Sequence, residues 1–242
     1  MRLTRVYVDG ALAPGGRITL TGSAANHVTR VLRLRVGAEL TLFNGRGGEY
    51  AAQIEAAKGS AVTVSIAEHR PIERESPLVL TLAQGVSRAE RMDLVVQKAT
   101  ELGASRLVPL ITERSVVRLT AGQADRKLNH WRAIAIGACE QCGRNRLPQV
   151  AAPVTLTDYV KQRDGTTRLL LSPVSATCLA DAPRPGEAMT VLVGPEGGLT
   201  EVEQAAALAA GFTPVRLGPR VLRTETAAIA AVALLQREYG DL

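Results

Sequence analysis

Residues 189–235 read MTVLVGPEGGLTEVEQAAALAAGFTPVRLGPRVLRTETAAIAAVALL, and this stretch decides the fold. It contains two strand-to-helix units in succession, each with a glycine-bearing turn at its head. The short, apolar, β-branched run 190–193 predicts a buried strand, and a helix that starts with a capping box follows at Thr200. A second strand at 215–217 leads to a final helix that Thr224 can cap. Because α/β proteins bind ligands where strands end at helix N-termini, the stretch indicates a ligand site.

The composition favours aliphatic cores and an anionic partner. Of the 242 residues, 46% are hydrophobic and only 3% are aromatic, which suits parallel α/β layers better than an aromatic-rich sandwich. The formal net charge of +6 favours nucleic acid as a partner, although a surface charge without a partner explains it equally well. The N-terminus lacks an apolar leader and no apolar run approaches membrane-spanning length, so we expect a cytoplasmic protein without membrane contact.

The cysteines and histidines indicate neither a disulfide framework nor a metal site. Three cysteines, an odd number, favour a reducing compartment. Cys139 and Cys142 have the spacing of a metal or redox pair, but no second pair accompanies them, and buried or half-buried helical cysteines are the favoured interpretation. No metal-ligand spacing joins the histidines, which are His27, His69 and His130. We therefore expect no metal.

The secondary-structure pattern divides the chain into two domains. Short strands with one or two helices fill residues 1–72, which predicts a small, mostly β module. Residues 73–77 are charged and proline-flanked, as in a linker. Strands then alternate with helices over 78–242, which predicts a parallel sheet with helices on both faces. Ser87 and Glu90 predict a capping box at the first of these helices.

Arginines dominate the charge of the first forty residues. Only Asp9 and Glu39 oppose the six arginines there, which are Arg2, Arg5, Arg17, Arg30, Arg33 and Arg35. The consistent use of arginine in place of lysine favours contacts with phosphates. A solvated surface is the alternative.

Three strand ends carry turn residues, and these are Ser172-Pro173, Gly194-Pro195-Glu196-Gly197-Gly198 and Gly218-Pro219. Glycines let backbone groups approach a flat ligand beyond the carboxyl ends of parallel strands. Apolar walls for a ligand such as a purine can come from Leu171, Val193, Leu217 and Leu222. The alternative is that each glycine only makes a tight turn. The motifs GxxxxGK[ST], GxSxG and a strand-to-helix GxGxxG are absent, which argues against a nucleotide hydrolase, other hydrolases and a dinucleotide fold.

Charged residues near these loops allow two interpretations. Glu196, Arg220, Arg223 and Glu225 lie in or beside the loops, and 140–146 ends a helix in a polar, basic loop. The arginines either cap helix ends and pair with carboxylates, or bind RNA phosphates or a developing oxyanion on a base. Both interpretations fit the sequence.

Several motifs together resemble one family. They are LVGPEGGLTEVE (192–203), LGPRVLRTETA (217–227), KATELG (98–103), ERS (113–115), EQCGRN (140–145), HVTRVLR (27–33) and LFNGRG (42–47). They resemble the RsmE family, ribosomal small-subunit RNA methyltransferases that methylate N3 of a uridine. The likeness spans nearly the whole chain, and EQCGRN differs in one residue from the ERCGRN form associated with the family.

The resemblance implies a fold, a cofactor and partners. Residues 1–72 would be a PUA-like β-barrel that grips RNA, and 78–242 a SPOUT-type α/β domain whose C-terminal segment threads a deep trefoil knot. The knot would hold S-adenosylmethionine against Leu171, Ser172, Pro173, Val193, Gly194, Pro195, Glu196, Gly197, Gly198, Leu217, Gly218, Leu222, Arg223, Thr224 and Thr226. The substrate would be a uridine near the decoding centre of 16S rRNA in the small ribosomal subunit. A homodimer is implied, and the Ala-rich helix 227–235 has a small-residue face suited to its interface.

The chemistry of the implied substrate assigns further roles. Uracil N3–H is a weak acid, so methyl transfer needs removal of that proton or stabilisation of the anion. Arg223 is the expected electrostatic group, and Glu196 or Glu225 the expected general base. The alternative is that these carboxylates only order the loops through backbone N–H groups. Expected RNA contacts are Arg2, Arg5, Arg30, Arg33, Arg144 and Asn145.

Two other functions also fit the sequence. One is a SPOUT methyltransferase that acts on a different RNA, such as a tRNA. The other is a non-catalytic RNA-binding protein that keeps the fold.

Overall fold

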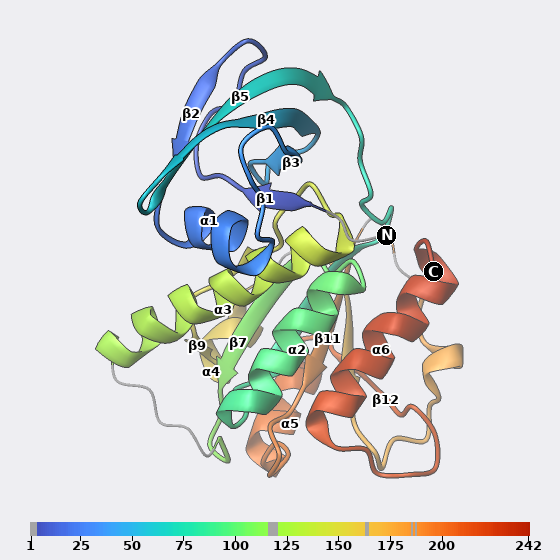
Figure 1. Cartoon of the computed structure of the whole chain (residues 1–242). Helices are drawn as coiled ribbons and strands as arrows, with labels where there is room; N and C mark the ends of the chain where they lie inside the picture. Colours follow the sequence, from blue (N-terminus) through green and yellow to red (C-terminus); the bar gives the residue numbers. More distant parts are fainter. Residues whose placement is uncertain (1–3, 116–120, 163–164, 185, 187) are drawn as a thin grey trace. The chain divides into compact units, whose positions relative to one another are not determined.

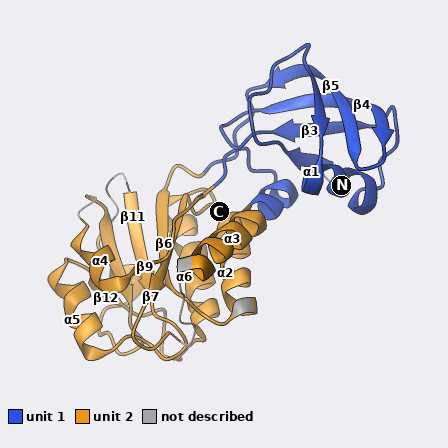
Figure 2. Cartoon of the chain, turned by 90° about the vertical axis from the view of Figure 1, so that its left-hand side faces the viewer, with its two compact units in different colours: residues 1–75, 136–147 blue, residues 76–135, 148–242 orange. Residues whose placement is uncertain are grey.

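The computed structural model (Figure 1) describes residues 4–115, 121–162, 165–184, 186 and 188–242. The chain forms two compact units, which Figure 2 colours separately. Unit 1 comprises Met1–Glu75 and Ile136–Leu147, and unit 2 comprises Ser76–Ala135 and Pro148–Leu242. The division after Glu75 falls within the expected linker 73–77. Residues 136–147, which the sequence pattern placed in the second domain, group with unit 1.

Unit 1 is built on a five-stranded sheet. Its strands are β1 (Arg5–Tyr7), β2 (Arg17–Leu20), β3 (Glu39–Phe43), β4 (Glu49–Lys58) and β5 (Ala61–Arg70). They lie in the order β1-β3-β4-β5-β2, with β1 and β3 parallel and the other neighbours antiparallel. Alternate residues of β5, namely Val62, Val64 and Ile66, are buried, as expected for a strand with one face on a core. The helix α1 (Gly22–Asn26) and the π-helix η1 (His27–Val31) follow β2.

Unit 2 contains a sheet of seven strands whose pairs are all parallel. The strands are β6 (Val79–Gly85), β7 (Arg106–Ile111), β8 (Gln149–Val150), β9 (Val154–Thr155), β10 (Thr167–Leu171), β11 (Ala188–Val193) and β12 (Thr213–Val215). They lie in the order β12-β10-β11-β6-β7-β8, and β9 also pairs with β7. The helical segments are α2 (Ala89–Glu101), α3 (Ala121–Cys142), α4 (Leu156–Lys161), η2 (Leu179–Asp181), α5 (Glu201–Ala209) and α6 (Thr224–Tyr239), and the part of α3 from Ile136 on belongs to unit 1.

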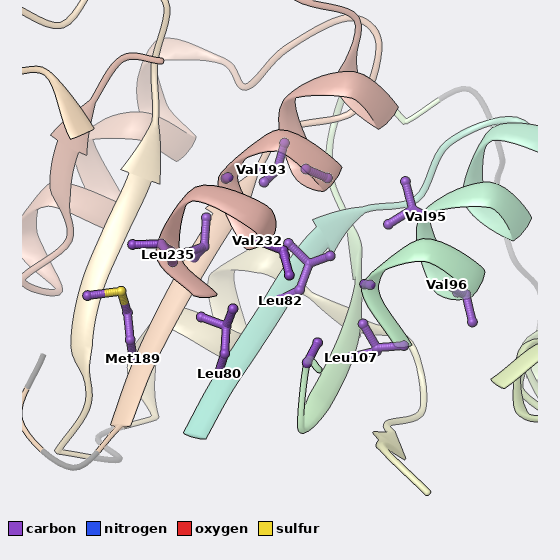
Figure 3. Close-up of a cluster of buried hydrophobic side chains, with 14 of the residues drawn as sticks. Leu80, Leu82, Val95, Val96, Leu107, Met189, Val193, Val232 and Leu235 are labelled. Atoms are coloured by element: carbon purple, nitrogen blue, oxygen red, sulfur yellow. The ribbon is translucent and has the colours of Figure 1, made fainter. Parts of the chain in front are cut away.

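The two faces of this sheet are buried under different helices. Leu80 and Leu82 of β6 share a cluster with Val95 of α2 and Val232 of α6 (Figure 3). The next residue of β6, Ala83, belongs to a second cluster that includes residues of α4 and α5, among them Leu156, Tyr159 and Ala207. Successive strand residues point to opposite faces, so the two clusters cover the two sides of the sheet. The predicted parallel sheet with helices on both faces is confirmed.

Local capping chemistry is confirmed at α5 and wrong at α2. Thr200 caps α5: its hydroxyl accepts from the Glu203 N–H at 3.3 Å, and the Glu203 carboxylate accepts from the Thr200 N–H at 2.9 Å. At α2 the N-cap is Arg88, and no side-chain cap bond forms there among the described residues. The Ser87 hydroxyl donates to the Gly85 carbonyl instead, because Ser87 is buried beside the end of β6.

The start of α6 also differs from the prediction. The N-cap is Arg223, and Thr224 is the first helical residue, with its hydroxyl bound to a distant carbonyl, that of Gly194. The strand before this helix covers Thr213–Val215 and not 215–217, since its partners in β10 end at Leu171. Among the helices of the described ranges, none has both the length and the apolar character that a membrane crossing requires.

Candidate functional site

A cavity of about 640 Å³ lies at the carboxyl ends of three neighbouring strands, β10, β11 and β12. The loops that follow these strands form most of its wall, at 172–174, 194–199 and 216–223. The last residues of the strands, Leu171 and Val193 among them, contribute apolar surface. Both the volume and the position are typical of a small-molecule site in an open α/β sheet.

Two glycines let the backbone come close to this cavity. A Cβ on Gly85 would lie 2.5 Å from the Pro195 nitrogen, so the end of β6 and the loop after β11 meet only because residue 85 has no side chain. Gly218, in the loop after β12, has a φ of +143°, which other residues rarely adopt. Since Pro195 and Gly218 both line the cavity, these glycines fix the shape of its wall.

The buried amide of Gln84 fastens the loop after β11 to the start of α6. Gln84 is 1% exposed, and its Nε2 donates to Thr224 Oγ1 at 2.9 Å and to the Gly194 carbonyl at 3.3 Å. Thr224 Oγ1 donates in turn to the Gly194 carbonyl at 2.6 Å. Gly194 and Thr224 both line the cavity, so this network joins two parts of the wall that lie 30 residues apart in the chain.

Two carboxylates beside the cavity share one arginine. Glu196 lines the cavity, and its Oε1 accepts from the Arg88 backbone N–H at 3.0 Å and from Arg91 Nη1 at 3.3 Å. Glu225 lies in the first turn of α6, where the helix dipole favours a negative charge. Its Oε1 is 3.9 Å from Arg91 Nε, and Glu225 is not part of the cavity wall. The backbone contact of Glu196 is the kind expected of a loop-ordering carboxylate.

Arginine dominates the charge of the cavity wall. Against the single carboxylate of Glu196, the wall carries Arg91, Arg114, Arg216, Arg220 and Arg223. Arg114 donates to the Gly197 carbonyl at 3.2 Å, and Arg216 donates to the carbonyls of Ser175 and Ala176. Arg223 is exposed, and the ion pairs found within the described residues do not include it. Its guanidinium is therefore available to a negative charge in the cavity.

The Cys-x-x-Cys pair lies at the end of α3. Cys139 is buried, Cys142 is half-buried, and neither forms a disulfide. A hydrogen bond with Cys142 and burial both raise the pKa of the Cys139 thiol. Since the thiolate is the nucleophilic form, the raised pKa makes Cys139 a weak nucleophile. The prediction of buried or half-buried helical cysteines is confirmed, and no cluster of metal-binding side chains occurs in the part of the chain that the structure describes.

Comparison with known proteins places the chain in a family. A family model of the RNA methyltransferase domain matches residues 74–236, and one of the RNA methyltransferase PUA domain matches residues 20–67. Ribosomal RNA small subunit methyltransferase E of Buchnera aphidicola subsp. Schizaphis graminum is 32% identical over 242 residues, which cover 100% of this chain and 98% of that protein. The chain belongs to the RsmE family of RNA methyltransferases. The member from Synechocystis sp. is 35% identical over 224 residues, which cover 89% of this chain and 71% of that protein.

Solved structures in and near the RsmE family have the same fold. A methyltransferase from Legionella pneumophila, in complex with S-adenosylmethionine, is 44% identical over 100% of both chains, with a TM-score of 0.96. Ribosomal RNA small subunit methyltransferase E from Neisseria gonorrhoeae, bound to the same molecule, is 37% identical over 99% of both chains, with a TM-score of 0.92. The predicted fold class, a PUA-like module followed by a SPOUT-type parallel α/β domain, is confirmed. The trefoil knot stays a prediction.

Most of the site residues that the RsmE resemblance implied come together in the cavity. Of the expected cofactor contacts, all but Gly197 and Thr226 line it. These include Arg223 and Glu196, which are also expected to take part in the reaction. Sequence reasoning missed Arg91, Arg114, Val174, Gln204, Arg216 and Val221, which also line it. Of these only Arg114 carried a signal, the ERS motif. The roles of all these residues toward a ligand stay predictions.

The residues expected to bind RNA separate into three groups. Arg2 lies outside the described residues. Arg30 and Arg33 are exposed at η1 and just after it, and Arg33 has a φ of +55°, a conformation that costs a non-glycine residue energy. The other three, Arg5, Arg144 and Asn145, are buried in unit 1.

The three buried residues belong to an ion-pair network. Arg5 lies 2.6 Å from both Glu49 Oε2 and Asn145 Oδ1, and Arg144 lies 2.6 Å from Glu75 Oε2. Burial raises the pKa of Glu49, but hydrogen bonds from Arg74, Arg5 and Asn145 outweigh it, and the pKa falls below its usual value. Because the guanidinium groups of Arg5 and Arg144 are occupied inside unit 1, we restrict the proposal of RNA contact to Arg30 and Arg33.

Proposed function

We propose that the protein transfers a methyl group from S-adenosylmethionine to N3 of a uridine in 16S rRNA, near the decoding centre. The cavity at the ends of β10, β11 and β12 carries this proposal. The Neisseria gonorrhoeae RsmE, with 37% identity over 99% of both chains, was solved with S-adenosylmethionine bound, and this chain shares its fold.

The cavity suits this methyl donor in size and chemistry. Its volume of about 640 Å³ lies within the range of pockets that hold small-molecule ligands. Leu171, Val193, Leu217 and Leu222 supply apolar wall for a flat ring, and the glycine loops supply backbone donors and acceptors for its edge. The bound donor supplies an electrophilic methyl group on a sulfonium. The predicted knot, in which the segment after β12 closes over the site, is part of the same proposal.

The protein's own groups then act on the uridine. Loss of the N3 proton leaves negative charge on the uracil ring, which extends to its carbonyl oxygens. Arg223 is exposed, lines the cavity and has no ion pair with other described residues, so it stabilises that charge as it develops. Glu196 is the better placed of the two candidate bases, because Glu225 lies outside the wall. Its contacts with Arg88 and Arg91 also support the alternative, in which Glu196 only orders its loop.

Unit 1 contributes to RNA binding through its exposed arginines. No acidic residue occurs between Asp9 and Glu39, whereas Arg30 and Arg33 are both exposed. Such a surface neutralises phosphates and makes RNA binding dependent on salt.

A homodimer completes the proposal. Ala228 and Ala231 of α6 are already buried inside unit 2, so this part of the small-residue face is used within one subunit. Leu234, which is 48% exposed, is an apolar residue of α6 that remains for a second copy, and Ile229, Ala230 and Ala233 are half-buried.

Mass mapping of methylated nucleosides tests the reaction. Purified small ribosomal subunits and, separately, tRNA are incubated with the protein and S-adenosylmethionine, and the digested RNA is examined for 3-methyluridine. We expect the product in 16S rRNA only. Methylation of tRNA alone would show a different substrate. If titration calorimetry finds no binding of S-adenosylmethionine, the proposal that the protein is a methyltransferase is refuted. Arg223→Ala should lower the rate of methylation far more than it lowers cofactor affinity.

A further inference from the structure

Arg91, near the start of α2, contacts two segments that build the proposed site. Its Nη1 lies 3.3 Å from Glu196 Oε1 in the loop after β11, and its Nε lies 3.9 Å from Glu225 Oε1 in the first turn of α6. The two carboxylates are 29 positions apart in the chain. We infer that Arg91 is a positioning residue, a shared counter-charge that keeps Glu196 and Glu225 together and thereby holds the cavity wall in its binding shape. This inference rests on the proposed function.

Burial of the carboxylates makes the counter-charge necessary. The side chain of Glu196 is 18% exposed and that of Glu225 is 12% exposed. In each, the Oε2 atom is buried and has no hydrogen-bond partner among the described residues. Two like charges that face the same arginine in partly desolvated positions repel each other, because a low dielectric screens them less than water does. Arg91 is the cation that both of them face at these distances.

The position of Arg91 links this charge balance to the ligand. Arg91 itself lines the cavity, as does Glu196, and Glu225 follows two residues after Arg223 at the start of α6. Without the Arg91 contacts, the loop after β11 and the N-terminus of α6 are held together by the Gln84, Thr224 and Gly194 hydrogen bonds alone, and Arg223 is positioned less accurately. We therefore expect loss of Arg91 to weaken binding of the methyl donor and to slow methyl transfer.

The chain supplies a matched control on the same helix. Lys98 of α2 pairs with Glu101, and its side chain is 39% exposed, compared with 37% for Arg91. Lys98 does not line the cavity. Lys98→Gln therefore removes a cation of similar exposure from the same helix without touching Glu196 or Glu225.

Titration calorimetry with S-adenosylmethionine on the full chain tests the inference. Arg91→Gln should weaken binding about tenfold, since a buried carboxylate is left without its partner. Lys98→Gln should bind as wild type does. The decisive variant is Arg91→Gln combined with Glu225→Gln: removing one of the two repelling charges should restore most of the lost affinity.

Two results would overturn the shared counter-charge. The first is that Arg91→Gln binds S-adenosylmethionine with wild-type affinity. The second is that the double variant binds it as weakly as Arg91→Gln does, because an arginine that acts only through packing of its side-chain stem is not rescued by removal of a charge. Thermal midpoints of the same variants report on folding: the double variant should melt above Arg91→Gln. If the wild-type protein does not bind S-adenosylmethionine, the proposed function fails, and the order of the midpoints still decides whether Arg91 is the shared counter-charge.

Discussion

Replacing Thr224 with valine tests whether the Gln84 network shapes the cavity. Thr224 is 8% exposed, and its hydroxyl bonds the Gly194 carbonyl at 2.6 Å and the Gln84 amide at 2.9 Å. Valine removes the hydroxyl from this buried position. Each buried group that loses its partner costs about 1–3 kcal/mol. The Gly194 carbonyl keeps a bond from Gln84 at 3.3 Å, and Gln84 keeps one to the Gly85 carbonyl at 2.9 Å. For the two groups together we therefore expect the free energy of unfolding to fall by an amount near the lower end of this range, about 2 kcal/mol in total.

Thr224→Ser is the control, because serine keeps the hydroxyl and removes one methyl group. That methyl contributes roughly 0.8 kcal/mol when buried. In a chain of this size each kcal/mol lowers the thermal midpoint by roughly 2–4 °C, so the valine variant should lose roughly 4–8 °C and the serine variant less than half of that. Circular dichroism measures both midpoints, and calorimetry measures binding of S-adenosylmethionine, which should weaken in the valine variant only.

The reasoning fails if the valine variant melts no lower than the serine variant. It also fails if the valine variant is less stable but binds S-adenosylmethionine as tightly as wild type, because the network would then stabilise unit 2 without shaping the cavity.

Three further predictions address other parts of the chain. Gly85→Ala places a Cβ 2.5 Å from the Pro195 nitrogen, so calorimetry should find weaker S-adenosylmethionine binding, and unchanged affinity would contradict the close approach. Arg33→Gly should raise the thermal midpoint of unit 1, since a left-handed non-glycine residue costs about 1–2 kcal/mol. The same variant should bind RNA more weakly with a shallower salt dependence, and steeper salt dependence would refute the phosphate contact. Burial raises the pKa of Glu49, but hydrogen bonds from Arg74 and two other neighbours lower it by more than burial raises it. The folded pKa therefore lies below the unfolded value of about 4.3. The stability that this carboxylate contributes is therefore present above that value and is lost as the pH falls through the folded pKa. Acid titration of the thermal midpoint should show this loss in wild type and a flatter profile in Glu49→Gln.

The features that sequence predicted correctly are those with local causes. The capping box at Thr200 needs only Glu203, three residues away, and it forms as expected. The alternation of strands and helices after residue 78 follows from periodicity within each segment, and it gave the parallel sheet. The turn at Gly194 marks a strand end by composition alone, and Gly194 and Gly218 both line the cavity.

The features that were missed depend on contacts between distant segments. Arg91 and Glu196 are separated by 105 positions, and Gln84 and Thr224 by 140. No spacing rule reaches so far, and a glutamine at the end of a buried strand has no pattern of its own. The same cause accounts for the error at Thr224. A threonine before an Ala-rich helix is a sound cap by local rules, but its hydroxyl bonds Gly194 across the fold, and Arg223 takes the cap position.

Three consecutive residues at the start of α6 have different roles at the site. Thr224 and Glu225 are buried, and each is tied to another element, the first to Gly194 and Gln84 and the second to Arg91. Arg223, directly before them, is exposed and lines the cavity. A charge stabilises a developing anion best when it is held in place before the reaction and needs no reorganisation. Thr224 and Glu225, the two buried anchors, hold the backbone next to Arg223 in place. The guanidinium of Arg223 therefore needs no ion pair of its own to be positioned. Damage to either anchor should therefore lower the rate of methyl transfer even at saturating cofactor, because Arg223 is then held less accurately.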